Sequence, residues 1–222
     1  EPPQPVASTY KLGSKEDFVR YLHAADIKLV RGAYLKKLLS EGRVWPRRQE
    51  AEDEADALYR PELTEDFKFV GVSHAWESME HPDPCGFQLR QIVDHARRHH
   101  RYFFDECFFF IDYMSLYQYK RNDQGQEEAF RHAMKAMHLF YANSSSDFCS
   151  VWRVERLTPA SCWRRELKAG RTVPVYDEVV GAVVEKQLSQ LTRNTTPYSC
   201  RGWCCAEVEW SRPIPKQQFE TF

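Results

Sequence analysis

The sequence predicts an α/β protein: a parallel sheet with flanking helices over residues 66–222, preceded by an α-helical N-terminal extension over residues 1–65. Two observations lead to this fold class. From residue 66 onward, β-type and helical segments alternate, and that order builds a parallel sheet with crossover helices. The run Phe108–Ile111 is continuously apolar, as strands buried on both faces are. A length of 222 residues suits one domain with a substantial extension, or two small ones.

Three helices are expected in the extension. Ser14 stands at an N-cap position, with Asp17 three residues later and apolar residues at helical spacing after it. Arg31–Glu41 predicts a second helix with one apolar face, which ends at Gly42. Arg47–Tyr59 is rich in Glu, Asp, Ala and Arg, a composition that favours a third helix with one solvated face.

The α/β domain is predicted to follow in strict alternation. Strands are expected over residues 67–72, 108–111 and 148–154. Apolar residues at helical spacing predict helices over residues 87–100 and 126–141. Residues 174–191 predict a strand and then a helix, and a last helix begins near Trp203.

Composition and charge exclude several function classes. Lys and Arg number 31 and Asp and Glu 32, for a net charge of -1, which argues against a nucleic-acid clamp. The chain contains neither GxGxxG nor GxxxxGK(S/T), the signatures of Rossmann and P-loop nucleotide binding. Its apolar runs are far shorter than the ~20 residues of a membrane span, so no membrane span is expected.

Cysteine usage favours an intracellular protein. The seven cysteines are odd in number, mostly dispersed, and form no CxxC, which is typical of reduced thiols. The polar, proline-rich start shows no signal-peptide pattern. We therefore expect an intracellular location, most simply the cytoplasm, with an organelle as the alternative. Cys200, Cys204 and Cys205 lack the spacing of structural zinc sites, so no metal site is expected.

Three segments are candidates for a ligand site, because ligands of open parallel sheets bind beyond the carboxyl ends of the strands. Residues 73–77 follow the first predicted strand of the α/β domain, residues 112–118 follow the second, and residues 201–207 open the last helix. We expect these segments to meet at one edge of the sheet.

Each candidate residue also has a purely structural explanation. Ser73 would cap a turn, His74 would be a solvated or core-edge histidine, and Asp112 would cap the helix after it. Trp203 would be a core residue, and Glu207, on the same helix face, a surface neighbour. Alternatively, Glu207 is a carboxylate at a cleft wall with a raised pKa, able to act as a base or to stabilise a cationic sugar. Ser73 and His74 are adjacent in a strand, so their side chains point apart and form no dyad.

Taken together, four segments resemble HET (heterokaryon incompatibility) domains, in the correct order over residues 67–210. Residues 70–76 are similar to the family's opening strand, an apolar stretch followed by Ser, then His or Tyr, any residue, and Trp. Residues 110–118 look like its Ile-Asp-x-x-x-Ile-x-Gln segment, and residues 134–142 like the helix that follows. Residues 201–207 resemble its Arg-x-Trp-(Thr/Cys)-x-x-Glu segment. The Trp-Cys-x-x-Glu within it also matches TIR (Toll/interleukin-1 receptor) domains, to which HET domains are distantly related.

The resemblance implies a flavodoxin-like sheet and a nucleotide site. In enzymatically active TIR domains the matching glutamate cleaves the nicotinamide–ribose bond of NAD, so Glu207 would be catalytic and NAD(P) the substrate, with no cofactor required. A carboxylate suits this reaction because it stabilises an oxocarbenium-like sugar. The ligand-contacting residues implied by position are Ser73, His74, Trp76, Asp112, Tyr113 and Trp203.

A non-catalytic function is the alternative that the resemblance leaves open. TIR-like domains work by self-association, so the chain would then be a signalling or assembly module, or a structural subunit of a larger complex. The accessibility of Glu207 discriminates between the two classes. If packed side chains seal it and no cavity reaches it, catalysis through this residue is disfavoured.

Overall fold

The central sheet is mixed but mostly parallel. The structure, a computed structural model, describes residues 10–99, 104–142, 148–212 and 219–222. Within them, six strands lie in the order β2-β1-β4-β3-β5-β8. β4 (Cys107–Phe110), β3 (Lys68–His74), β5 (Cys149–Val154) and β8 (Phe219–Thr221) pair in parallel. β1 (Leu29–Arg31) runs antiparallel to β4 and to β2 (Leu58–Tyr59). The α/β class is confirmed.

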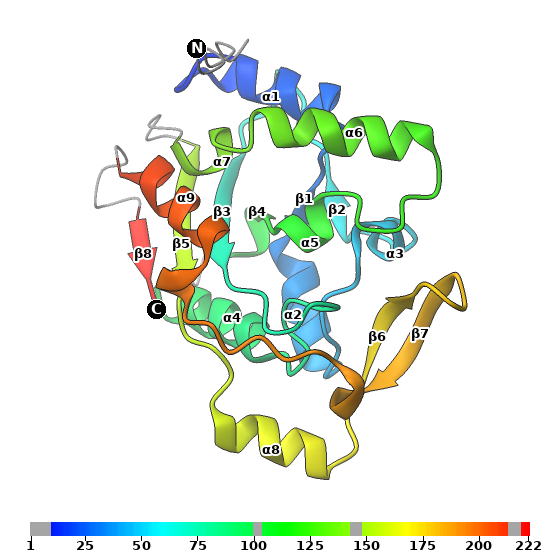
Figure 1. Cartoon of the computed structure of the whole chain (residues 1–222). Coiled ribbons are helices and arrows are strands. Elements are labelled where there is room, and N and C mark those ends of the chain that lie inside the picture. The colour runs from blue at the N-terminus through cyan, green and yellow to red at the C-terminus, as the bar shows by residue number, and fades with distance from the viewer. Residues whose placement is uncertain (1–9, 100–103, 143–147, 213–218) are drawn as a thin grey trace, which may run out of the picture.

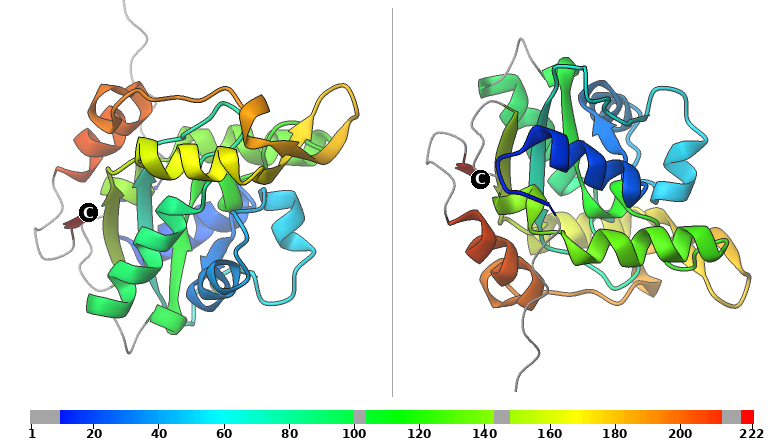
Figure 2. Two further views of the ribbon diagram at one scale, coloured as in Figure 1. Left: turned by 90° about the horizontal axis from the view of Figure 1, so that it is seen from below. Right: turned by 90° about the horizontal axis from the view of Figure 1, so that it is seen from above.

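Helices cover both faces of this sheet (Figures 1 and 2). α1 (Lys15–Ala24), α6 (Gln124–Lys135) and α7 (Leu139–Ala142) pack on the face to which Phe69 and Val151 point. α2 (Gly32–Ser40) and α4 (Phe87–His99) pack on the opposite face, against Val70 and Trp152. Successive side chains of a strand point to opposite faces, so the apolar runs of β3 and β5 supply both cores.

The helices predicted near the amino end are confirmed in part. The hydroxyl of Ser14 accepts a hydrogen bond from the amide of Asp17 at 3.1 Å and caps α1, and α2 matches the second predicted helix. The helix predicted over residues 47–59 is wrong beyond its first turn. Only α3 (Arg48–Glu52) is helical, and Asp56 adopts a φ of 58°, which a helix does not accommodate. The ring of Tyr59, in β2, then stacks on Phe108 of β4, so sheet pairing overrides helix propensity.

The segment after β5 also differs from the prediction. α8 (Ala160–Lys168) was not expected, and residues 174–191 form no long helix. Instead β6 (Thr172–Asp177) and β7 (Ala182–Gln187) form an antiparallel hairpin, which projects from the body of the molecule (Figure 1). Val173 and Val175 alternate into a small core with Trp163, which is the period of a strand rather than of a helix.

The predicted extension contributes to the same sheet as the rest of the chain. β1 and β2 form one edge of the sheet, and α1 and α2 supply core residues to its two faces. The division at residue 65 stays a prediction. None of the helices that the structure describes has the length and apolar character needed to cross a membrane.

Gly71 sets how closely α7 approaches β3. A Cβ at this position would lie 2.5 Å from the carbonyl oxygen of Phe140, closer than such atoms pack. The absence of a side chain therefore lets α7 lie against the strand, where the hydroxyl of Tyr141 is 3.4 Å from the carbonyl oxygen of Val72. This contact places Tyr141 beside the carboxyl end of β3.

Candidate functional site

The three candidate segments meet at the carboxyl end of β3. Ser73 and His74 are the last residues of that strand, Asp112 follows β4 at the start of α5 (Asp112–Ser115), and Glu207 lies on α9 (Gly202–Ser211). Parallel pairing of β3 with β4 brings the first two segments together. The third is joined by a hydrogen bond from Ser73 to Glu207.

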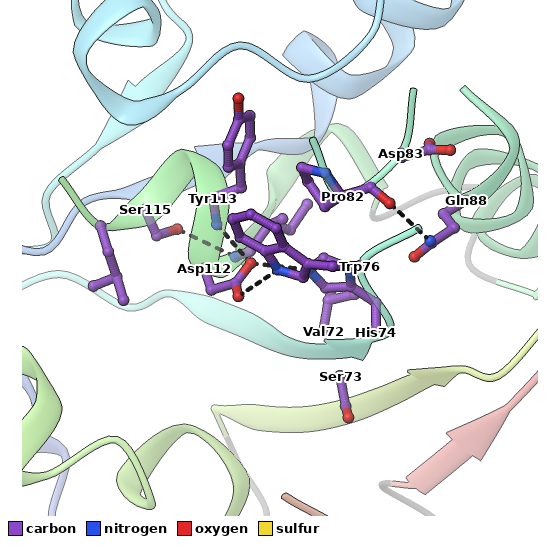
Figure 3. Close-up of polar contacts among 12 residues, drawn as sticks. Val72, Ser73, His74, Trp76, Pro82, Asp83, Gln88, Asp112, Tyr113 and Ser115 are labelled. Atoms are coloured by element: carbon purple, nitrogen blue, oxygen red, sulfur yellow. Dashed lines mark hydrogen bonds and ion pairs between the residues drawn. The ribbon is translucent and has the colours of Figure 1, made fainter. Parts of the chain in front are cut away.

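Asp112 is the centre of one polar cluster (Figure 3). Its carboxylate lies 2.9 Å from Nε2 of His74 and accepts hydrogen bonds from the Trp76 indole at 3.0 Å and from the Tyr113 amide at 2.6 Å. Burial by itself would raise the pKa of this carboxyl, but the His74 charge and these hydrogen bonds lower it. Burial would likewise lower the pKa of His74, and Asp112 raises it instead. Each of the two residues therefore favours the charged form of the other.

Glu207 lies on the other side of β3, in a second cluster. Ser73 donates a hydrogen bond to its Oε2 at 2.5 Å and also hydrogen-bonds the hydroxyl of Tyr198. Ser73 and His74 thus point to opposite sides of the strand, as predicted (Figure 3). Glu207 is only 3% exposed. Burial raises the pKa of Glu207 to about 7, although hydrogen bonds from Ser73 and Tyr141 oppose the shift.

A cavity of about 460 Å³ opens on the first cluster and not on the second. Four of the predicted site residues line it: His74, Trp76, Asp112 and Trp203. Ser73, Tyr113 and Glu207 are not among the lining residues. Trp203 is 39% exposed, so it is a wall residue rather than a core residue.

Two kinds of side chain line this cavity. The apolar side chains, which we call the apolar wall, come from α6 and from the residues that follow α5 and α6: Leu116, Phe130, Met134 and Met137. The polar side chains of Asn194 and Arg201, which we call the polar wall, also line it, as does Gln118 in the loop after α5. Asn194, Arg201 and the apolar wall were not identified from the sequence as site residues. Arg201 opens the segment of residues 201–207 that resembles HET domains, but the resemblance assigns it no role. No motif or spacing in the sequence indicates a role for Asn194.

The polar wall is held by a segment, residues 192–201, that is tied to the loop after β3. The amide of Asn194 donates to the carbonyl of Glu77 at 2.8 Å, and the amide of Met79 donates to the carbonyl of Thr192 at 3.1 Å. Arg201 donates to the carbonyl of Trp76. The polar wall is therefore fixed by direct hydrogen bonds to the loop that carries Trp76.

Tyr113 faces a second cavity, of about 430 Å³, which shares Trp76 and Gln118 with the first. Its ring contacts Trp76 edge-on, with the centroids 5.4 Å apart. Trp76 therefore stands between the two spaces, and Tyr113 supports it from the far side.

Metal and thiol chemistry find no support here. Among the described residues, no group of three or more His, Cys, Asp and Glu side chains is placed to hold a metal ion. Cys204 lines the cavity, but burial raises the pKa of its thiol to about 12, far from that of a reactive thiolate.

Comparisons with protein-family models, with curated proteins and with solved structures found no match to the chain.

Proposed function

We propose that the chain is a HET/TIR-like signalling module that binds NAD(P), or a related nicotinamide nucleotide, in the cavity between Trp76 and Trp203. The observation that carries the proposal is this cavity, which lies at the carboxyl ends of parallel strands, where open α/β sheets bind ligands. Its volume of about 460 Å³ falls within the usual range for small-molecule sites.

The chemistry of the walls suits a flat, polar heterocycle. Indole rings stack on heteroaromatic bases, and the pyridinium of oxidised nicotinamide adds a cation–π attraction. The apolar wall excludes water from one side of such a ring. Nε2 of Gln118 donates to the carbonyls of Asp112 and Leu116, and Oδ1 of Asn194 accepts from the Thr196 amide. The remaining Oε1 of Gln118 and Nδ2 of Asn194 are an acceptor and a donor that match the carboxamide of nicotinamide.

The burial of Glu207 favours binding over cleavage through that residue. Its carboxyl group is hydrogen-bonded to Ser73, sealed at 3% exposure, and does not line the cavity. A group that stabilises a cationic ribose must approach the sugar directly.

A second candidate function, cleavage of the nicotinamide–ribose bond, is favoured by one observation about Asp112. This carboxylate lines the cavity and its pKa is lowered, so it is ionised at neutral pH. An ionised carboxylate beside a bound nucleotide stabilises an oxocarbenium-like sugar. In that case Asp112, rather than Glu207, would be the catalytic residue.

Isothermal titration of NAD into the purified protein tests the binding proposal. Trp203→Ala should raise the Kd at least about tenfold, because stacking of one base on an aromatic ring contributes roughly 1–3 kcal/mol. Trp203→Phe, which keeps an aromatic face at the same position, is the matched control and should lose much less affinity than Trp203→Ala. If NAD does not bind, or if it binds equally to Trp203→Ala and to the unmodified protein, the proposal is wrong.

Nicotinamide release, measured by chromatography on the same samples, separates the two functions. No release by a protein that binds NAD supports the module. Release that is lost in Asp112→Asn but kept in Glu207→Gln supports cleavage through Asp112. Release that is lost in Glu207→Gln would restore the catalytic role predicted for Glu207 from the resemblance.

A further inference from the structure

Arg201 lines the cavity with part of its hydrogen-bonding capacity unused. Nε donates to the carbonyl of Thr196 at 2.8 Å, Nη2 to the carbonyl of Asn194 at 3.3 Å, and Nη1 to the carbonyl of Trp76. A guanidinium has five N–H donors. Three of them are directed to backbone carbonyls, which leaves, within the part of the chain that the structure describes, one N–H without a partner on each of the two terminal nitrogens.

The positive charge of Arg201 also has no carboxylate bound to it. Among the described residues its hydrogen bonds go to neutral carbonyl groups, and none of the ion pairs includes it. Asp112, the ionised carboxylate of the cavity, is paired with His74. Glu77 acts on Arg201 through space, but the hydrogen bonds that its Oε1 accepts come from the Thr158 amide at 3.0 Å and from Gln88 at 3.2 Å.

The cavity lining therefore carries a net positive charge at its polar wall. Arg201 is partly buried, and burial lowers the pKa of its guanidinium, yet an arginine stays protonated at neutral pH. A partly buried cation without a counter-ion is unfavourable, and a ligand that carries an anion relieves the cost. The amino end of α9, which starts at the next residue, adds partial positive charge on the same side.

We propose that Arg201 is the anion subsite of this cavity and that the ligand held there carries a phosphate group. The inference rests on the proposed function, and it adds which residue would hold the phosphate of the bound nucleotide. The two remaining N–H groups of a guanidinium match the oxygens of a phosphate, and such charge-assisted hydrogen bonds are among the strong ones in proteins.

A purely structural role for Arg201 makes a different prediction. If the residue only ties residues 192–201 to the loop after β3, its substitution should loosen the whole polar wall. Every ligand of the cavity would then lose affinity to the same extent, whether or not it carries a phosphate. The ratio of two affinities therefore distinguishes the roles.

The test compares nicotinamide mononucleotide with nicotinamide riboside, which differ by the phosphate alone. Isothermal titration should show the mononucleotide binding about 10- to 100-fold more tightly, as expected for hydrogen bonds to a charged group. In Arg201→Gln this preference should fall to within about twofold, with the riboside affinity unchanged. Arg193→Gln is the matched control, since Arg193 lies in the same segment, packs on Trp163 and does not line the cavity. It should keep the preference.

The outcomes separate this inference from the proposed function. Parallel loss of affinity for both ligands in Arg201→Gln, or equal affinities in the unmodified protein, would overturn the anion subsite and leave nicotinamide binding intact. If neither ligand binds, the proposed function is wrong. The thermal stability of the protein with inorganic pyrophosphate then tests the anion subsite by itself. Thermal stabilisation by pyrophosphate that disappears in Arg201→Gln and persists in Arg193→Gln would still support the subsite. No stabilisation would refute it.

Discussion

Glu207→Gln should make the protein more stable at alkaline pH while changing little at acidic pH. The carboxyl group is buried against Ser73, and its pKa is raised from 4.5 to about 7. Because the folded-state pKa lies above that of the unfolded chain, Glu207 contributes stability that is fully present below pH 4.5 and is lost as pH rises through about 7. A glutamine has no proton to lose, so the variant escapes this loss.

The size of the effect follows from the two pKa values. Between pH 5 and pH 8, ionisation of Glu207 should lower the free energy of unfolding of the unmodified protein by about 2–3 kcal/mol relative to the variant. The variant also keeps a side-chain oxygen that accepts from Ser73, so its stability at pH 5 should be within about 1 kcal/mol of the unmodified protein. Every other titrating group is present in both proteins and largely cancels from the difference.

Urea unfolding followed by circular dichroism at pH 5, 6, 7 and 8 measures this difference. Glu209→Gln is the matched control, an equivalent substitution on the same helix at a side chain that is 56% exposed. Its stability difference from the unmodified protein should not grow with pH. A difference for Glu207→Gln that is constant between pH 5 and pH 8, or that falls, would show that the carboxyl group is not buried as described.

Three further predictions concern the fold and the first polar cluster. Gly71→Ala should lower the free energy of unfolding by about 1–3 kcal/mol, because the added methyl group meets the carbonyl of Phe140, and an unchanged urea midpoint would contradict this contact. Ser14→Ala should cost about 1 kcal/mol through loss of the helix cap; Ser14→Asp, which restores an acceptor, should recover most of it. Asp112→Asn should lower the pKa of His74, followed by nuclear magnetic resonance of the imidazole; an unshifted titration would show that the pair is not coupled.

Local chemistry explains which parts of the fold were predictable. Strands β3, β4 and β5 are short apolar runs that no competing pattern obscures, and the Ser14 cap is a signal contained within four residues. The opposite orientations of Ser73 and His74 follow from strand geometry alone. By contrast, β2 has the composition of a helix end, and it is a strand because Leu29 and Phe108 lie where it can pair and stack.

The location of the candidate site was predictable from the sequence, but the arrangement of its side chains was not. The rule that ligand sites form at strand ends located Trp76, Asp112 and Trp203 around one cavity. The same rule gives no information on how deeply each side chain is buried. It therefore placed Glu207 in the site, although packing around Ser73 and Tyr198 buries the Glu207 carboxyl group. Burial depends on side chains far away in the sequence, and a motif of seven residues does not record them.

The bonds that build the site span most of the chain, and this affects when the site can form during synthesis. Ser73 and Glu207 are 134 residues apart, and Arg201 and Trp76 are 125 apart. Domains fold as the chain leaves the ribosome, amino end first, and contacts between distant residues form late. β3 and β4 can pair early, but the cavity has no polar wall until residues 192–201 have emerged. A nascent or truncated chain that stops before Asn194 would therefore contain the central strands and lack the polar wall of the cavity.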